Sequence, residues 1–322
     1  MKKTPNKDNT AAKKAGKGVS LAVELGPLKL KNPVLTASGT FGYGEEYAKY
    51  YSLNRLGGIT VKGLSLAPRQ GNPPPRICET PSGMLNAVGL QNVGVEDFIR
   101  YKLPFLKRYD IKVIVNIFGG TIEEYEAVAA RLDRVEGVHA IEVNISCPNV
   151  RRGGMSFGND LDATYDVLRA VRGATGLPVI AKLSPNVADV SPFAERAARA
   201  GVDALSLINT LLGMAIDVRT RRPRLANVTG GLSGPAIRPV AVRAVWQAHR
   251  AVGLPIIGMG GIMTGEDAIE FILAGASAVA VGTANFINPT AAPDVVEGIR
   301  KYLLDYGIDD VRQLVGRVET PA

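Results

Sequence analysis

Residues Ala140–Asn149, AIEVNISCPN, decide the fold class of this 322-residue chain. The segment begins as an apolar β pattern and ends in a polar cluster at a proline, which cannot continue a strand ladder. A parallel barrel carries its chemistry at the C-terminal ends of its strands. The Cys147 thiol, between two asparagines at such an end, is therefore a candidate acid/base or nucleophile. The alternative is that Cys147 is a small buried apolar residue without a chemical role.

Seven other short apolar runs lie along the chain, with amphipathic stretches between them. Most of the runs are continuous, which is typical of strands buried on both faces. The alternation predicts an α/β fold, a (β/α)₈ TIM barrel, with a doubly wound open sheet as the alternative. The predicted strands are Val34–Ser38, Ile59–Gly63, Val113–Phe118, Ala140–Cys147, Val179–Ser184, Ala204–Thr210, Pro255–Gly260 and Ala278–Thr283. The predicted helices include Ile122–Val135, Leu161–Thr175, Pro192–Ala200, Ile237–Val252 and Glu266–Leu273.

Three connections are too long for simple strand-to-helix loops: Leu64–Gly94, Asn149–Asp160 and Leu211–Ile237. All three leave C-terminal strand ends, so we expect these long loops to lie over the C-terminal face of the barrel. Leu21–Leu25 and Leu28–Leu30 flank a Gly-Pro turn, which predicts a small N-terminal β-hairpin.

The net charge of +8 is concentrated at the N-terminus. The first eighteen residues hold six lysines and one aspartate (+5), and the rest of the chain holds 32 basic and 29 acidic residues (+3). We expect a disordered lysine-rich tail over residues 1–19 and a single barrel domain over residues 20–322. Because the tail has no interleaved aromatics, no nucleic-acid partner is expected.

The numbers of cysteines and histidines and the lengths of the apolar runs exclude several classes of protein. Two cysteines give no disulfide framework, and no apolar run has the length of a membrane span or of a signal segment. A cytoplasmic protein without a membrane partner is therefore expected. With only His139 and His249 in the chain, a histidine-rich metal site is excluded and no metal is expected.

Glycine turns follow the last two predicted strands. Gly260 and Gly261 end the seventh strand, and Gly282 with Thr283 ends the eighth. The loops after these strands form the usual phosphate site of a TIM barrel, because glycine lets the backbone approach the anion. Gly234 adds a third contact from the loop after strand six. The motifs predict a phosphorylated ligand, with ordinary tight turns as the alternative.

Two lysines in apolar strands indicate what that ligand is. Lys62 ends the second strand and Lys182 lies in the fifth. A buried lysine is costly unless it is paired or bound to a ligand. A cation beside the ring of a flavin stabilises the anionic reduced form. A structural ion pair with a carboxylate such as Glu142 is the alternative. Uncharged hydrogen-bonding groups for a ring come from Asn116, Asn144 and Asn209.

In this order and spacing, the motifs resemble the class 1 dihydroorotate dehydrogenases, soluble FMN enzymes of pyrimidine biosynthesis. The resemblance covers roughly residues 25–284, nearly the whole barrel. Besides the glycine turns, it rests on residues 37–42 (ASGTFG), 60–63 (TVKG), 83–92 (GMLNAVGLQN), 143–149 (VNISCPN), 208–210 (INT) and 231–237 (GLSGPAI). The GLQN segment, residues 89–92, resembles the NAD-linked type, whose catalytic subunit works with a second subunit that carries FAD and an iron–sulfur cluster.

The resemblance implies two sets of contacts. FMN contacts are implied for Ser38, Lys62, Gly63, Asn116, Asn144, Lys182, Ile208, Gly234, Gly260, Gly261, Gly282 and Thr283. Dihydroorotate and orotate contacts are implied for Lys62, Asn86, Ala87, Val88, Gly89, Leu90, Asn144, Asn149, Asn209 and Thr210.

The resemblance also implies a reaction and a partner. Cys147 is the general base that takes the C5 proton of dihydroorotate while hydride passes to FMN; the membrane-bound class uses serine. Two cysteines are too few for a cluster, and no dinucleotide fingerprint is present. Electrons are therefore expected to reach NAD through the FAD and iron–sulfur subunit, in a heterotetramer of two catalytic and two electron-transfer chains. The basic loop Arg219–Arg224 either contacts a partner or is solvated.

Other functions stay open on the sequence. A stand-alone fumarate-dependent dihydroorotate dehydrogenase differs only in the electron acceptor. The pyrimidine-reducing barrel of dihydropyrimidine dehydrogenase shares the Ser-Cys-Pro turn, but this chain has no flanking cluster domains and carries Asn149 after the proline. In a non-redox phosphosugar isomerase or aldolase, Lys182 would form a Schiff base or polarise a carbonyl. A barrel that serves only as a binding scaffold is the least specific alternative.

Overall fold

The computed structural model describes residues 18–145, 157–319 and 321. Near its N-terminus lies the predicted hairpin, in which β1 (Val23–Leu25) pairs antiparallel with β2 (Leu28–Leu30). Almost all of the predicted lysine-rich tail lies outside the described residues, so its disorder stays a prediction. Among the described helices, none is both long enough and apolar enough to span a membrane.

Eight parallel strands close into the predicted barrel, in which neighbours follow chain order. All of these strands are buried almost throughout, which explains their continuous apolar sequences. The strands are β3 (Val34–Thr36), β4 (Gly58–Thr60), β7 (Lys112–Ile117), β8 (Ala140–Asn144), β9 (Val179–Lys182), β10 (Ala204–Leu207), β15 (Ile256–Met259) and β16 (Ala278–Val281).

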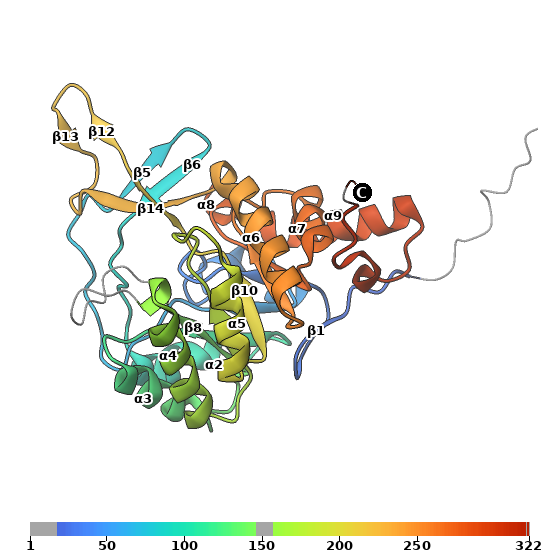
Figure 1. The fold of residues 1–322 in the computed structure, drawn as a ribbon, viewed down its shortest axis with the longest axis horizontal. Helices are drawn as coiled ribbons and strands as arrows, with labels where there is room; N and C mark the ends of the chain where they lie inside the picture. The colour runs from blue at the N-terminus through green and yellow to red at the C-terminus, as the bar shows by residue number, and fades with distance from the viewer. Residues whose placement is uncertain (1–17, 146–156, 320, 322) are drawn as a thin grey trace, which may run out of the picture.

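Helices cover the outside of the barrel and contact one another in chain order (Figure 1). Their starts follow from local chemistry, because Thr121, Asp160 and Thr264 each accept a hydrogen bond from a backbone N–H of the first turn. The longer helices are α3 (Ile122–Leu132), α4 (Leu161–Ala174), α5 (Ser191–Ala200), α6 (Arg238–Ala251), α7 (Gly265–Ala274) and α9 (Ala291–Tyr306). Short helices are α1 (Val95–Asp97), α2 (Leu103–Leu106) and α8 (Ala284–Ile287), with a π-helical turn over Phe98–Lys102.

The connections after β4 and β10 contain an antiparallel sheet that the sequence analysis did not predict. We call it the roof sheet; it has the strand order β11-β14-β6-β5 and lies at one end of the barrel (Figure 1). Its strands are β5 (Ile77–Thr80), β6 (Gly83–Asn86), β11 (Leu211–Met214) and β14 (Thr229–Ser233). A two-stranded extension, β12 (Ile216–Asp217) and β13 (Arg222–Pro223), projects beyond it. Of the third long connection, residues 146–156 lie outside the described residues.

His139 is a half-buried group directly before β8, at the N-terminal end of that barrel strand. Its Nδ1 accepts a hydrogen bond from the backbone N–H of Val113 at 3.1 Å, at the start of β7. Burial lowers the pKa of His139 below its usual value, and the nearby Lys112 ammonium lowers that pKa further. The folded protein therefore favours the neutral imidazole.

We predict that His139 makes the fold sensitive to mild acid. The pKa of His139 is lower in the folded than in the unfolded chain. Well above pH 6.5 the imidazole is neutral in both states and has no effect on stability. As the pH drops through about 6.5 the unfolded chain takes up the proton first, which destabilises the fold. From this one group, the free energy of unfolding changes by less than about 1.4 kcal/mol per pH unit. Urea unfolding of the wild type and of His139→Asn at pH 5 to 8 measures it. The variant should show the shallower dependence, and equal slopes would exclude the histidine as the source.

Candidate active site

One cavity of about 480 Å³ lies where the barrel strands end and the roof sheet begins. Every site residue predicted from the sequence and described by the structure lines it. These are Ser38, Lys62, Gly63, Asn86, Ala87, Val88, Gly89, Leu90, Asn116, Asn144, Lys182, Ile208, Asn209, Thr210, Gly234, Gly260, Gly261, Gly282 and Thr283. Cys147 and Asn149 lie outside the described residues. The shared cavity is a fact of the structure, and the roles assigned to its residues stay predictions.

Glycine turns form one wall of the cavity. Gly234 and Gly261 have φ values of +97° and +80°, which L side chains rarely adopt. A Cβ on Gly261 would lie 2.9 Å from the Gly234 carbonyl oxygen, and one on Gly234 would lie 2.7 Å from the Gly83 Cα. The wall also carries two hydroxyl groups, since Thr283 Oγ1 donates to Ser233 Oγ at 2.8 Å. Bare backbone beside hydroxyl groups suits a phosphate.

The N-terminus of α7 is capped from within the helix. Asp267 accepts hydrogen bonds from the backbone N–H groups of Met263 and Thr264, both at 2.9 Å, while Thr264 caps the Asp267 N–H. A carboxylate therefore already caps this helix end. The glycine turns and the Thr283 and Ser233 hydroxyl groups stay the candidate phosphate donors on this side of the cavity.

A buried polar layer crosses four adjacent strands of the barrel. The Glu142 carboxylate on β8 accepts hydrogen bonds from Asn116 Nδ2 of β7 at 2.6 Å and from Ser206 Oγ of β10 at 2.9 Å. Lys182 Nζ of β9 lies 3.7 Å from the same carboxylate, and the two side chains are only 5% and 1% exposed. The ion pair considered from the sequence is therefore present. Lys182 also lines the cavity, so pairing and ligand contact do not exclude each other.

The side-chain oxygen of Asn116, in the cavity wall, is a hydrogen-bond acceptor without a donor from the described protein. Its Nδ2 is used by Glu142, while its Oδ1 is buried and has no hydrogen-bond partner among the described residues. A buried amide oxygen without a donor costs about 1–3 kcal/mol. A bound molecule with an N–H or O–H donor beside Asn116 would satisfy this oxygen.

Linked amides line another part of the cavity. Asn209 Nδ2 donates to Asn144 Oδ1 at 3.2 Å, and the Thr210 backbone N–H donates to Asn209 Oδ1 at 2.9 Å. Asn186 fixes the next turn, since its Nδ2 donates to the Thr210 carbonyl at 3.1 Å and its Oδ1 accepts from the backbone N–H of Leu212 at 2.9 Å. Asn186 is not among the residues predicted from the sequence, although an asparagine two residues after a strand-end serine is a usable signal.

Two further residues that the sequence analysis missed hold the backbone of the site. The Tyr125 hydroxyl of α3 donates to the Asn144 carbonyl at 2.7 Å in the interior. Asn92 is buried, donates to the Leu90 carbonyl at 2.9 Å and accepts from the Gly94 N–H at 2.8 Å. These bonds fix the end of β8 and the turn after β6, so the amides reach the cavity on defined backbone.

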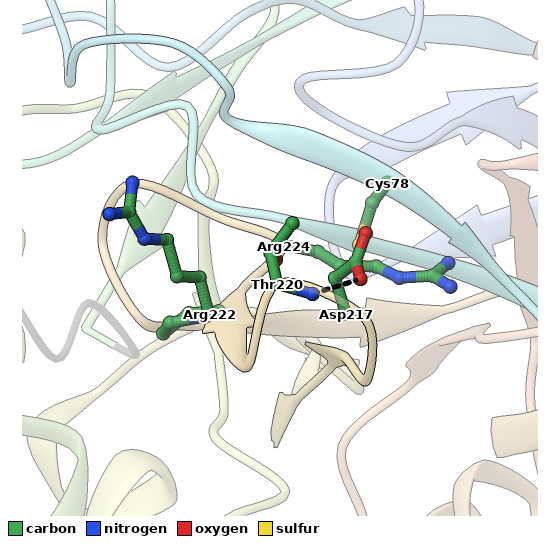
Figure 2. A pocket seen from close by; sticks show the side chains of 6 residues that line it. Cys78, Asp217, Thr220, Arg222 and Arg224 are labelled. Carbon is green, nitrogen blue, oxygen red and sulfur yellow. Dashed lines mark hydrogen bonds between the residues drawn. The ribbon is translucent and has the colours of Figure 1, made fainter.

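A separate hollow of about 650 Å³ lies at the two-stranded extension (Figure 2). Its lining includes Cys78, Asp217, Thr220, Arg222 and Arg224. The Arg222 and Arg224 side chains extend to opposite sides, and Asp217 accepts a hydrogen bond from the Thr220 backbone N–H at 3.0 Å (Figure 2). Although this hollow is larger, its charges do not converge, so the barrel cavity is the candidate active site.

We predict that Lys182 stabilises the fold through Glu142. Lys182→Met leaves the carboxylate buried without a cation, which should lower the free energy of unfolding by about 3–5 kcal/mol. Combining it with Glu142→Gln removes the charge and should recover part of that loss. Lys301→Met, which breaks an exposed ion pair with Asp305 on α9, is the control and should have little effect. Denaturant unfolding of these three variants and of Glu142→Gln alone measures the coupling, and additive losses would contradict it.

Comparison with known proteins places the chain among the dihydroorotate dehydrogenases. Residues 20–303 match the family model described as dihydroorotate dehydrogenase. A relative from Desulforudis audaxviator is 62% identical over 298 residues, covering 92% of this chain and 97% of that protein. Another, from Desulforamulus reducens, is 59% identical over 298 residues, covering 92% and 98%. Both are named dihydroorotate dehydrogenase B (NAD(+)), catalytic subunit.

A solved structure shares the fold. The dihydroorotate dehydrogenase of Eimeria tenella, crystallised in complex with ferulenol, aligns with a TM-score of 0.77 at 23% identity. The alignment covers 94% of this chain and 89% of that one. The family match and the relatives agree over nearly the whole described barrel, and on that ground the chain belongs to the dihydroorotate dehydrogenase family.

Proposed function

We propose that this chain is the FMN-dependent catalytic subunit of an NAD-linked dihydroorotate dehydrogenase in the cytoplasm. It would oxidise dihydroorotate to orotate in pyrimidine biosynthesis. The observation that carries the proposal is the single cavity that gathers a glycine wall, a buried lysine and linked amides. The relatives named as catalytic subunits of dihydroorotate dehydrogenase B support it from sequence.

The family implies a flavin, and the residues present fit FMN. The glycine wall with Gly234 and Gly261 suits its phosphate, and the wall formed by Asn116 and Lys182 suits its ring. The unpartnered Asn116 oxygen matches a ring N–H, and the Lys182 ammonium would stabilise negative charge on the reduced ring. Bound there, FMN would supply a hydride acceptor.

The substrate would bind between the flavin site and the roof sheet. Lys62 carries the positive charge suited to a carboxylate, and Asn144, Asn209 and Thr210 offer amide and hydroxyl groups to the two ring amides. The segment from Asn86 to Leu90 belongs to the roof sheet and the turn after it, and would cover the substrate and exclude water. Asn149, outside the described residues, completes the proposed set.

Within this arrangement, Cys147 is proposed to take the proton from C5 as hydride leaves C6. Its place in the sequence, three residues after Asn144 at the end of β8, is consistent with that role. An ordinary thiol has a pKa near 8.5, so a thiolate base is far more available than a serine alkoxide at neutral pH.

Cys147→Ala should slow reduction of the bound flavin by dihydroorotate by about 10²–10⁴-fold while flavin content and orotate affinity are kept. Stopped-flow absorbance of the flavin under anaerobic conditions measures the rate. Cys78→Ala is the matched control, because Cys78 lines the separate hollow and should leave the rate unchanged. An unimpaired Cys147→Ala enzyme would exclude the thiol from the mechanism.

Electrons are proposed to leave through a second subunit that carries FAD and an iron–sulfur cluster, in a heterotetramer of two catalytic and two electron-transfer chains. The name "catalytic subunit" of the relatives supports a separate electron-transfer chain. The GLQN segment, residues 89–92, is the sequence feature in favour of NAD.

The isolated chain should therefore reduce artificial dyes with dihydroorotate but reduce NAD⁺ poorly. Addition of the electron-transfer subunit should restore NAD⁺ reduction. Steady-state assays with each acceptor, with and without that subunit, measure both. Rapid fumarate reduction by the isolated chain would overturn the NAD linkage and favour the stand-alone alternative. The proposed flavin site would be unaffected by that result.

A further inference from the structure

Two loops of the glycine wall meet in direct contact. The first loop runs from Gly234 into α6, and the second runs from Gly261 into α7. A Cβ on Gly261 would lie 2.9 Å from the Gly234 carbonyl oxygen and 2.9 Å from the Cβ of Arg238, the first residue of α6. The two helices that follow these loops also lie side by side (Figure 1). The shape of the wall therefore depends on how the two loops are held relative to each other.

An ion pair behind the glycine wall joins the two loops. Asp267 of α7 holds the second loop, because its Oδ2 accepts hydrogen bonds from the backbone N–H groups of Met263 and Thr264, both at 2.9 Å. Its Oδ1 forms an ion pair with Nη1 of Arg238, at the end of the first loop. Arg238 Nε also lies 3.2 Å from Oε2 of Glu270, one turn further along α7. Met263 lines the cavity, whereas the three charged residues do not, so they act on the wall from behind it.

Arg238 lies where its own helix disfavours a cation. The N-terminus of a helix carries a partial positive charge, and the first turn of α6 contains no acidic residue and no side-chain cap. Compensation for the arginine comes instead from Asp267 and Glu270, both on α7. The contact with α7, and not the stability of α6, explains why an arginine is placed here.

An unpaired carboxylate at the position of Asp267 would repel an anion at the wall. Asp267 binds the backbone N–H of Met263, two residues after Gly261, and two residues of chain span at most about 7 Å. The charge of Asp267 therefore reaches Gly261, because this span is shorter than the screening length of about 8 Å at physiological salt. Pairing with Arg238 cancels most of the repulsion, and the other carboxylate, Glu270, is half-exposed to water.

We propose that Arg238 is a positioning residue of the phosphate site: it neutralises Asp267, so that the carboxylate fixes the loop after β15 without repelling the phosphate. The inference rests on the FMN site proposed above. It adds that Arg238 contributes to recognition of the phosphate and not of the flavin ring. The ring has its own proposed neighbours, Asn116 and Lys182, so loss of Arg238 should leave ring binding in place.

A comparison of FMN with riboflavin, which has the same ring and no phosphate, tests the proposal. The flavin-free full chain is titrated with each compound, and the change in flavin fluorescence gives two dissociation constants. The wild type should favour FMN on the order of 100-fold or more, because two hydrogen bonds to a charged group have about that effect. Arg238→Met should reduce this preference on the order of 10-fold, while the affinity for riboflavin changes less than about 3-fold.

Arg131→Met is the matched control. Arg131 also pairs with a carboxylate, that of Glu96, and its side chain is 41% exposed against 36% for Arg238. The control removes the same charge from the chain and should keep the preference of the wild type. An unchanged preference in Arg238→Met, or an equal loss of affinity for both compounds, would overturn the proposal. A wild type that binds FMN and riboflavin equally well would overturn the phosphate site proposed above, and this inference with it.

A second variant tests whether Arg238 acts through Asp267. In Arg238→Met combined with Asp267→Asn, the asparagine oxygen can still accept from Met263 and Thr264, but no carboxylate at this position is left to repel the phosphate. The double variant should therefore recover most of the preference for FMN. A double variant as poor as Arg238→Met alone would contradict the role of Asp267 and overturn the proposal.

Discussion

A carboxylate buried in the barrel constrains the rest of the site. Glu142 is almost fully buried, and an isolated buried charge would be very unfavourable. Its neighbours are Asn116, Lys182 and Ser206, so four adjacent strands, β7 to β10, each contribute one side chain to the same polar layer. The cation and the amide that line the cavity are thereby positioned by strands of the barrel rather than by loops.

The roof sheet adds a second constraint, because its strands come from two segments far apart in the chain. The two segments are joined within the sheet by close backbone packing of β6 on β14, since a Cβ on Gly83 would lie 2.1 Å from the Ser233 carbonyl oxygen. Ser233 in turn accepts a hydrogen bond from Thr283 after the last barrel strand. One hydrogen bond therefore links the proposed phosphate wall to the sheet that carries the proposed substrate cover.

The sequence predicted the barrel because its strands are buried on both faces and its helices are amphipathic. Most predicted strands ran past their observed ends, and residues such as Ser38, Lys62, Asn209 and Thr283 lie in the excess. These residues lie beyond the hydrogen-bonded ends of the strands, where they line the cavity. An apolar sequence pattern does not show where the hydrogen bonding of a strand ends. The roof sheet was missed because its strands are short and its central pairing, β6 with β14, joins segments more than a hundred residues apart in the chain. Asn92 was missed because its role is to bind backbone of its own turn.

The central claim is that one cavity holds FMN and the substrate together. Diffraction from crystals of the purified protein grown with orotate tests it most directly. The account predicts flavin density with its phosphate at Gly234, Gly261 and Gly282, its ring beside Lys182 and Asn116, and orotate between that ring and Asn209. A cavity that holds a phosphosugar, or a flavin bound with its phosphate away from the glycine wall, would contradict it.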